Sequence, residues 1–158
     1  MADGQSAVIA VGNPWRADDG AGAQVVRRLA GRVPDDVRLI ELGGEPAELL
    51  DAWDGLGAVV VVDAVRTGGA PGTVHCFDAS QAPLPARTGG ASTHGLGLAD
   101  ALELGRALGR LPARVVVVGI EAGEDRRADA LSPPVQDAIE EASARVLAEL
   151  GQGRDSHA

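Results

Sequence analysis

The chain has 158 residues, a length that suits one domain with its own hydrophobic core. Its 45% hydrophobic and 23% charged residues are typical of a globular protein, and its net charge of −9 argues against a surface that tracks nucleic-acid phosphates. All 14 basic residues are arginine and the only cysteine is Cys76, which excludes a Walker A phosphate loop, a Schiff-base lysine, an internal disulfide and a multi-cysteine metal site.

Short apolar runs alternate with segments of helical periodicity along the chain. The runs predict five strands, at 7–11, 37–42, 58–62, 73–77 and 115–119. Apolar residues at helical spacing predict helices that begin at 18, 45, 95 and 133 and end near 31–34, 54, 108 and 150. Gly151 is expected to end the last helix and to leave 151–158 as a flexible tail.

This alternation predicts the α/β fold class. We expect a three-layer sandwich, similar to phosphorylase- and hydrolase-type folds, in which helices cover both faces of a mostly parallel five-stranded sheet. The run at 73–77 follows a turn rich in glycine and proline, which favours an antiparallel edge strand. The whole chain, 1–158, is predicted to form one domain with its core at about 7–150. Such sheets bind ligands beyond the carboxyl ends of their strands.

Two adjacent carboxylates, Asp18 and Asp19, follow the first predicted strand at the start of a helix. Either one is well placed to cap free backbone N–H groups and to favour the positive end of the helix dipole. Neighbouring side chains cannot both point the same way, so we expect one to cap and the other to face the sheet edge.

Asp63 directly follows the apolar run 58–62. A carboxylate there either accepts hydrogen bonds from neighbouring backbone N–H groups or serves at the ligand-binding edge of the sheet. Position alone leaves the two readings even.

His94 stands where a glycine-rich loop enters a predicted helix. A histidine at a helix start often bonds only to backbone, but the other two histidines are placed less well. His75 lies inside a predicted strand and His157 lies in the predicted tail. Asp19, Asp63 and His94 together would offer two carboxylates and one imidazole, a set that suits zinc or nickel with open coordination positions.

Several ordered motifs in this chain resemble those of the hydrogenase maturation endopeptidases. The resemblance runs from Val8 to about Leu150 and rests on short segments, of which GNPWRADDG at 12–20 and HGLGL at 94–98 are the most specific. The further matching segments are GGE at 43–45, VDA at 62–64, APGT at 70–73, VGIE at 118–121 and LSPPV at 131–135.

The resemblance implies an endopeptidase that trims the C-terminal extension of a nickel–iron hydrogenase large-subunit precursor after nickel insertion. The family's metal-contacting positions fall on Asp19, Asp63 and His94, which would also be the catalytic residues. Nickel would arrive bound to the precursor's own cysteine thiolates, and no organic cofactor is implied. The family has also been grouped with aspartic peptidases. Contacts with the substrate are expected from Asn13, Asp18, Gly43 and Gly44.

Two departures from the family pattern affect these expectations. The family often has glutamate where this chain has Asp19, which is shorter by one methylene but keeps the same oxygen chemistry. The glycine pair commonly continues with threonine, and Glu45 replaces it here.

Two alternative functions remain open on the sequence. A dinucleotide-binding module is suggested by the strand–helix–strand start and by Glu41 as a ribose-binding acid, although Pro14 and Trp15 replace the required glycine pattern. A chaperone that holds the precursor without cutting it is not excluded by the sequence.

The sequence contains no run of transmembrane length and starts without a basic, apolar signal peptide. Together with the lack of a disulfide framework, this predicts a soluble cytoplasmic protein, which we expect to be a monomer with no nucleic-acid or membrane partner.

Overall fold

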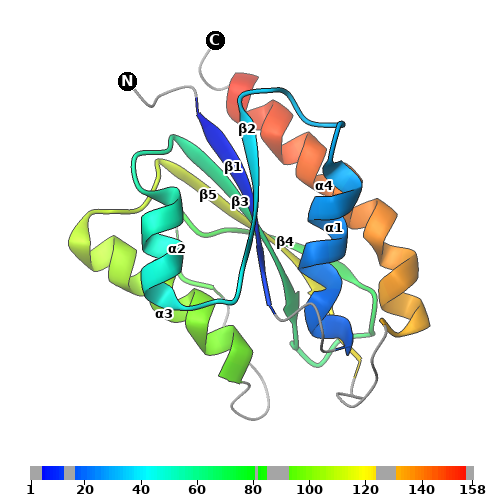
Figure 1. Cartoon of the computed structure of the whole chain (residues 1–158). Coiled ribbons are helices and arrows are strands. Elements are labelled where there is room, and N and C mark those ends of the chain that lie inside the picture. The colour runs from blue at the N-terminus through cyan, green and yellow to red at the C-terminus, as the bar shows by residue number, and fades with distance from the viewer. Residues whose placement is uncertain (1–4, 13–16, 81, 85–92, 124–130, 156–158) are drawn as a thin grey trace.

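The computed structural model describes residues 5–12, 17–80, 82–84, 93–123 and 131–155 (Figure 1). The side chains at 17, 93–96 and 153–155 also lie outside the described part. No helix in these ranges is both long and apolar enough to cross a membrane.

A five-stranded mixed sheet forms the centre of the molecule, with the strand order β2-β1-β3-β5-β4. The first four strands in that order are parallel to one another, and β4 runs antiparallel to β5 at one edge. The predicted fold class is therefore confirmed, including the antiparallel edge strand. The strands are β1 (Ser6–Val11), β2 (Val37–Leu42), β3 (Ala58–Val65), β4 (Val74–Asp78) and β5 (Arg114–Glu121).

Helices cover both faces of the sheet, with α1 and α4 on one face and α2 and α3 on the other (Figure 1). A short 3-10 turn, η2 (Ala17–Gly20), leads into the first helix. The helices are α1 (Ala21–Leu29), α2 (Pro46–Trp53), α3 (Thr93–Leu108) and α4 (Pro133–Asp155).

The valine run of β3 is continuously apolar because helices cover both faces of this strand. Val60 and Val62 pack into the core under α1 and α4, whereas Val59 and Val61 pack into the core under α2 and α3. Successive side chains of a strand point to opposite faces, so a strand covered on both sides must be apolar at every position.

The predicted ends of β3 and of the last helix are wrong. Asp63 does not close β3, because the strand continues to Val65 through its pairing with β5. Gly151 does not end the last helix, which runs on to Asp155, so the predicted tail is helical over 151–155. One helical glycine costs only about 1 kcal/mol relative to alanine, which is too little to stop a long helix.

Candidate functional site

Asp63 lies on β3 just beyond the end of its pairing with β1. That pairing ends at Ala10 and Val62, whereas β5 continues alongside, with Gly119 opposite Asp63. The Asp63 residue is only 4% exposed. Strand alternation directs it to the same face as Val61, the face that α2 and α3 cover. A carboxylate is therefore held at the carboxyl end of the sheet, where parallel α/β folds bind ligands.

Gly12 brings the turn carrying Asp19 against Asp63. Its φ of +134° favours glycine, and its N–H donates to the Leu42 carbonyl oxygen at 3.1 Å. A Cβ on Gly12 would lie 2.3 Å from the Asp19 carbonyl oxygen and 3.9 Å from Asp63 Oδ1. The close approach of the Asp19 carbonyl oxygen excludes a side chain at this position. The Asp19 backbone and the Asp63 carboxylate therefore lie on either side of Gly12 at this strand edge.

Asp18 and Asp19 are both buried, but their surroundings differ. Asp18 accepts hydrogen bonds from the backbone N–H groups of Gly123 and Ser132, each at 2.7 Å, and from the Ser132 hydroxyl at 2.9 Å. These donors follow β5 and precede α4, so Asp18 ties η2 to two distant segments. The prediction that one of the pair caps the first helix is wrong, because the N-cap residue of α1 is Gly20 and no side chain bonds there, whereas Asp18 binds N–H groups of other segments. Its predicted contact with substrate stays a prediction.

The replacement Asp18→Ala is expected to lower the free energy of unfolding by about 3 kcal/mol. It leaves two backbone N–H groups and one hydroxyl without their acceptor, at about 1–3 kcal/mol for each buried group that stays unsatisfied. Urea unfolding of the purified chain measures the loss. The exposed Asp51 provides the control, since Asp51→Ala should change stability by less than about 0.5 kcal/mol. Equal effects of the two replacements would contradict a structural role for Asp18.

His94 lies in the first turn of α3, which packs on the loop after β2. A Cβ on Gly97 would lie 2.1 Å from the Gly44 carbonyl oxygen, so the helix and the loop are in direct backbone contact. Gly44 itself has a φ of +100° and is buried, whereas Gly43 is exposed. This contact places the start of α3, and with it the His94 backbone, at the carboxyl end of the sheet.

The predicted ligand set is only partly described. The side chain of His94 and the whole of Asn13 lie outside the described residues. Among the side chains that the structure does describe, no group of three His, Cys, Asp or Glu residues is arranged to hold a metal ion. The set Asp19, Asp63 and His94 therefore stays a prediction.

Arg66 is a site residue that the sequence reasoning missed. Its Nη2 donates to Asp19 Oδ1 at 3.2 Å, and its side chain is 17% exposed. The sequence gives little signal for this pair, because 47 positions separate the two residues. The sequence also predicts that the strand ends at Asp63, which places Arg66 outside any predicted element.

Next to Arg66, Thr67 is bound to the buried Glu121 at the end of β5. The Thr67 N–H donates to Glu121 Oε2 at 2.8 Å, and its hydroxyl donates to Oε1. His75 Nε2 lies 3.0 Å from the same Oε1. Burial alone would raise the pKa of Glu121, but the hydrogen bonds from Thr67 and His75 outweigh it and hold that pKa below its usual value. Glu121 is therefore an ionised anchor for the segment after β3.

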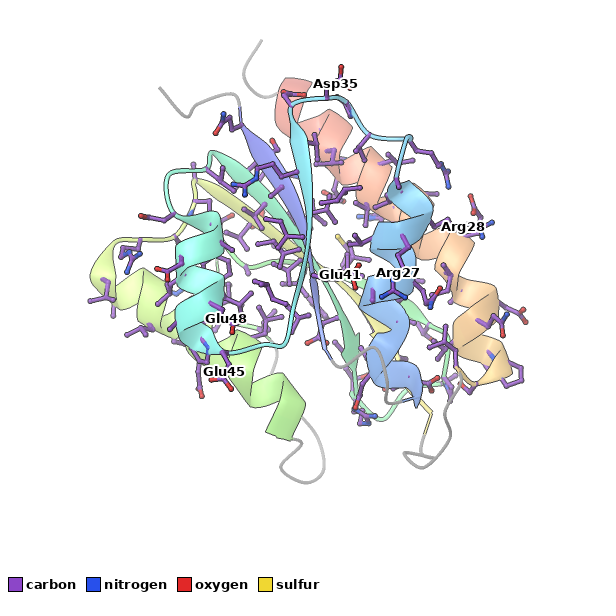
Figure 2. The ribbon with its side chains drawn as sticks, viewed as in Figure 1. Arg27, Arg28, Asp35, Glu41, Glu45 and Glu48 are labelled. Atoms are coloured by element: carbon purple, nitrogen blue, oxygen red, sulfur yellow. The ribbon has the colours of Figure 1, made fainter. Side chains whose placement is uncertain are left out.

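Glu41, the acid of the dinucleotide alternative, is engaged in an ion pair. Arg27 Nη2 lies 3.1 Å from Glu41 Oε1, and Figure 2 shows the two side chains pointing toward one another between α1 and β2. Glu45 and Glu48 lie at the start of α2, beyond the end of β2 (Figure 2). Glu45 is exposed, and its side chain does not cap the helix.

The fold of this chain is similar to that of solved hydrogenase maturation proteases. The fold matches the E. coli hydrogenase maturating endopeptidase HybD with a TM-score of 0.80 and 29% identity, covering 94% of this chain and 93% of that one. The NiFe hydrogenase maturation protease HybD of Thermococcus kodakarensis matches with a TM-score of 0.73 and 27% identity, covering 92% and 99%. The fold and its acidic strand edge thus define a protein of the maturation-protease class.

Sequence comparisons place the chain within that class. The hydrogenase 2 maturation protease of E. coli K12 is 33% identical over 146 residues, which cover 90% of this chain and 88% of that one. HupD, a hydrogenase expression/formation protein of Rhodobacter capsulatus, is 30% identical over 146 residues, covering 90% and 70%. The sequence profile of the hydrogenase maturation protease family, HycI, matches residues 23–149. The chain belongs to the hydrogenase maturation protease family and is a peptidase.

Proposed function

We propose that this chain is the endopeptidase that removes the C-terminal extension of a nickel–iron hydrogenase large-subunit precursor after nickel insertion. The observation that supports this most directly is that the backbone of the buried Asp19 and the carboxylate of the buried Asp63 both lie next to Gly12 at the carboxyl end of the sheet. In a member of the maturation protease family, this edge is the natural place for the reaction. The chain would act as a monomer in the cytoplasm.

Nickel is part of the substrate in this proposal. Carboxylate oxygens and an imidazole nitrogen suit a borderline divalent ion, so Asp19, Asp63 and His94 have the right chemistry to complete a coordination sphere that the precursor's thiolates begin. Three protein donors leave coordination positions open for the precursor's thiolates. Recognition would then depend on a metal that is already in the precursor.

The chain's carboxylates also offer a route to hydrolysis without a protein nucleophile. A carboxylate at Asp19 or Asp63 can accept a proton from an attacking water, as in aspartic-type peptidases. The substrate-bound ion would polarise the scissile carbonyl or activate the water, and one of the two carboxylates would act as base.

The loop between β2 and α2 is suited to hold the substrate backbone. A Cβ on the exposed Gly43 would meet nothing within 4 Å, whereas Gly44 is packed against α3. We therefore assign the substrate contact in this loop chiefly to Gly43, with Gly44 fixing its position. Asn13 in the first motif would contribute a side-chain amide, and Asp18 would position its neighbour Asp19.

Cleavage of purified precursor tests the proposal and its dependence on nickel. Nickel-loaded precursor should be shortened, and the nickel-free form should be cut at least ~100-fold more slowly, because the ion then supplies neither recognition nor charge stabilisation. Mass spectrometry of the products locates the cut. Equal rates on both forms would refute recognition through nickel. A stable complex that never yields a shorter product would instead support the chaperone alternative.

A further inference from the structure

A cation sits beside one of the two proposed metal-contacting carboxylates. Arg66 follows the end of β3, and its guanidinium bonds to Asp19 Oδ1. The two side chains are 17% and 8% exposed, so solvent screens their charges only in part. A metal ion that binds Asp19 must therefore share this carboxylate with a fixed positive charge, or displace it.

The segment carrying Arg66 is held in place from the other side. Thr67, the next residue, is bound to the buried Glu121 through both its N–H and its hydroxyl. Glu121 is in turn bound to His75 on β4. Because residue 67 is fixed at two atoms, the backbone of Arg66 cannot move far, and its guanidinium stays within reach of Asp19.

The Arg66 guanidinium does not hold Asp19 through two parallel N–H donors. Within the described part of the chain, the buried Nε of Arg66 has no hydrogen-bond partner, while Nη2 carries the contact with Asp19. A bidentate pair would use two parallel N–H donors and would be harder to separate. The observed arrangement neutralises Asp19 and still allows the carboxylate to be shared.

We propose that Arg66 is a specificity residue that keeps Asp19 from binding free divalent ions and thereby restricts the site to metal presented by the precursor. This inference rests on the function proposed above. A free Ni²⁺ ion brings two positive charges toward the guanidinium and is repelled, because like charges a few ångströms apart at low dielectric repel strongly. Each cysteine thiolate of the precursor cancels one of those charges. A nickel centre with two or more thiolates is neutral or negative, and Arg66 does not repel it.

Calorimetry with NiCl₂ on the purified full-length chain tests the proposal directly. Arg66→Gln removes the charge and should tighten binding of free Ni²⁺ by at least ~10-fold relative to the wild type. Arg66→Lys keeps the charge and should stay within about 3-fold of the wild type. Arg110 offers a matched control, since it faces Asp51 and Asp54 before β5, at the other end of the sheet. Arg110→Gln should leave nickel binding unchanged.

A double variant locates the gained affinity. Adding Asp19→Asn to Arg66→Gln should abolish the gain, because the extra ion is expected at the released carboxylate. Thermal unfolding establishes that each variant is folded, and Arg66→Met replaces Arg66→Gln if the latter does not fold. Binding by the charge-free variant that equals wild-type binding, or that is undetectable in both, overturns the proposal. So does a gain that survives loss of the Asp19 carboxylate.

Failure of this inference is distinguishable from failure of the proposed function. If the wild-type chain never shortens nickel-loaded precursor, the proposed function fails whatever the calorimetry shows. If the precursor is cut and the Arg66 variants bind free nickel like the wild type, the peptidase assignment stands and the role of Arg66 is refuted.

Discussion

Replacing Asp63 by asparagine is expected to lower kcat/KM for nickel-loaded precursor at least ~100-fold while the chain remains folded. The amide has nearly the same shape as the carboxylate, so packing at the end of β3 is kept. The change removes the negative charge, the stronger metal donor and the capacity to accept a proton. Initial cleavage rates measure the loss, and thermal unfolding measures stability alongside.

Asp19→Asn is expected to act in the same direction, and an exposed aspartate provides the control. Asp54 lies beyond α2 at the other end of the sheet, and its side chain is 60% exposed. Asp54→Asn should cleave at the wild-type rate. If Asp19→Asn and Asp63→Asn both cut as fast as Asp54→Asn, the carboxylates at the sheet edge are not the reaction site. A loss confined to one of them would identify the residue that matters.

The sequence predicts the strands well where burial alone determines them. The range 37–42 of β2 agrees at both ends, because its apolar pattern stops where the glycine pair begins. The end of β3 could not be predicted in the same way. Asp63 is polar, and a polar residue after five apolar ones normally indicates the end of a strand. Here the ladder with β5 continues to Val65, and that pairing depends on a strand more than fifty residues away.

At the site, too, some features follow from the local sequence and others depend on contacts between distant residues. The Asp18–Asp19 pair predicts a helix cap, but Asp18 instead binds Gly123 and Ser132, which lie 105 and 114 positions away and give no signal in the local sequence. Arg66 carries no recognisable motif, and only the folded structure brings it to Asp19. Residue types therefore indicate which chemistry is available, whereas long-range contacts decide which side chains remain at the site.

Gly97→Ala is expected to lower cleavage about 100-fold and the free energy of unfolding by about 2 kcal/mol. The added methyl would lie 2.1 Å from the Gly44 carbonyl oxygen, so α3 and the loop after β2 must separate. Overpacking of this kind costs about 1–3 kcal/mol, which exceeds the gain of about 1 kcal/mol from alanine in a helix. The activity loss is larger, because a shift of about 1 Å in the turn that carries His94 is enough to misalign the imidazole in its proposed role.

Gly151→Ala is the matched control, because it makes the same change within a helix where nothing lies within 4 Å. It should raise stability by up to about 1 kcal/mol and leave cleavage unchanged. Urea unfolding and precursor cleavage on both variants separate the two effects of alanine. If Gly97→Ala is stabilised like Gly151→Ala, the close contact between α3 and Gly44 does not exist. If it is destabilised but cuts normally, the start of α3 takes no part in the reaction.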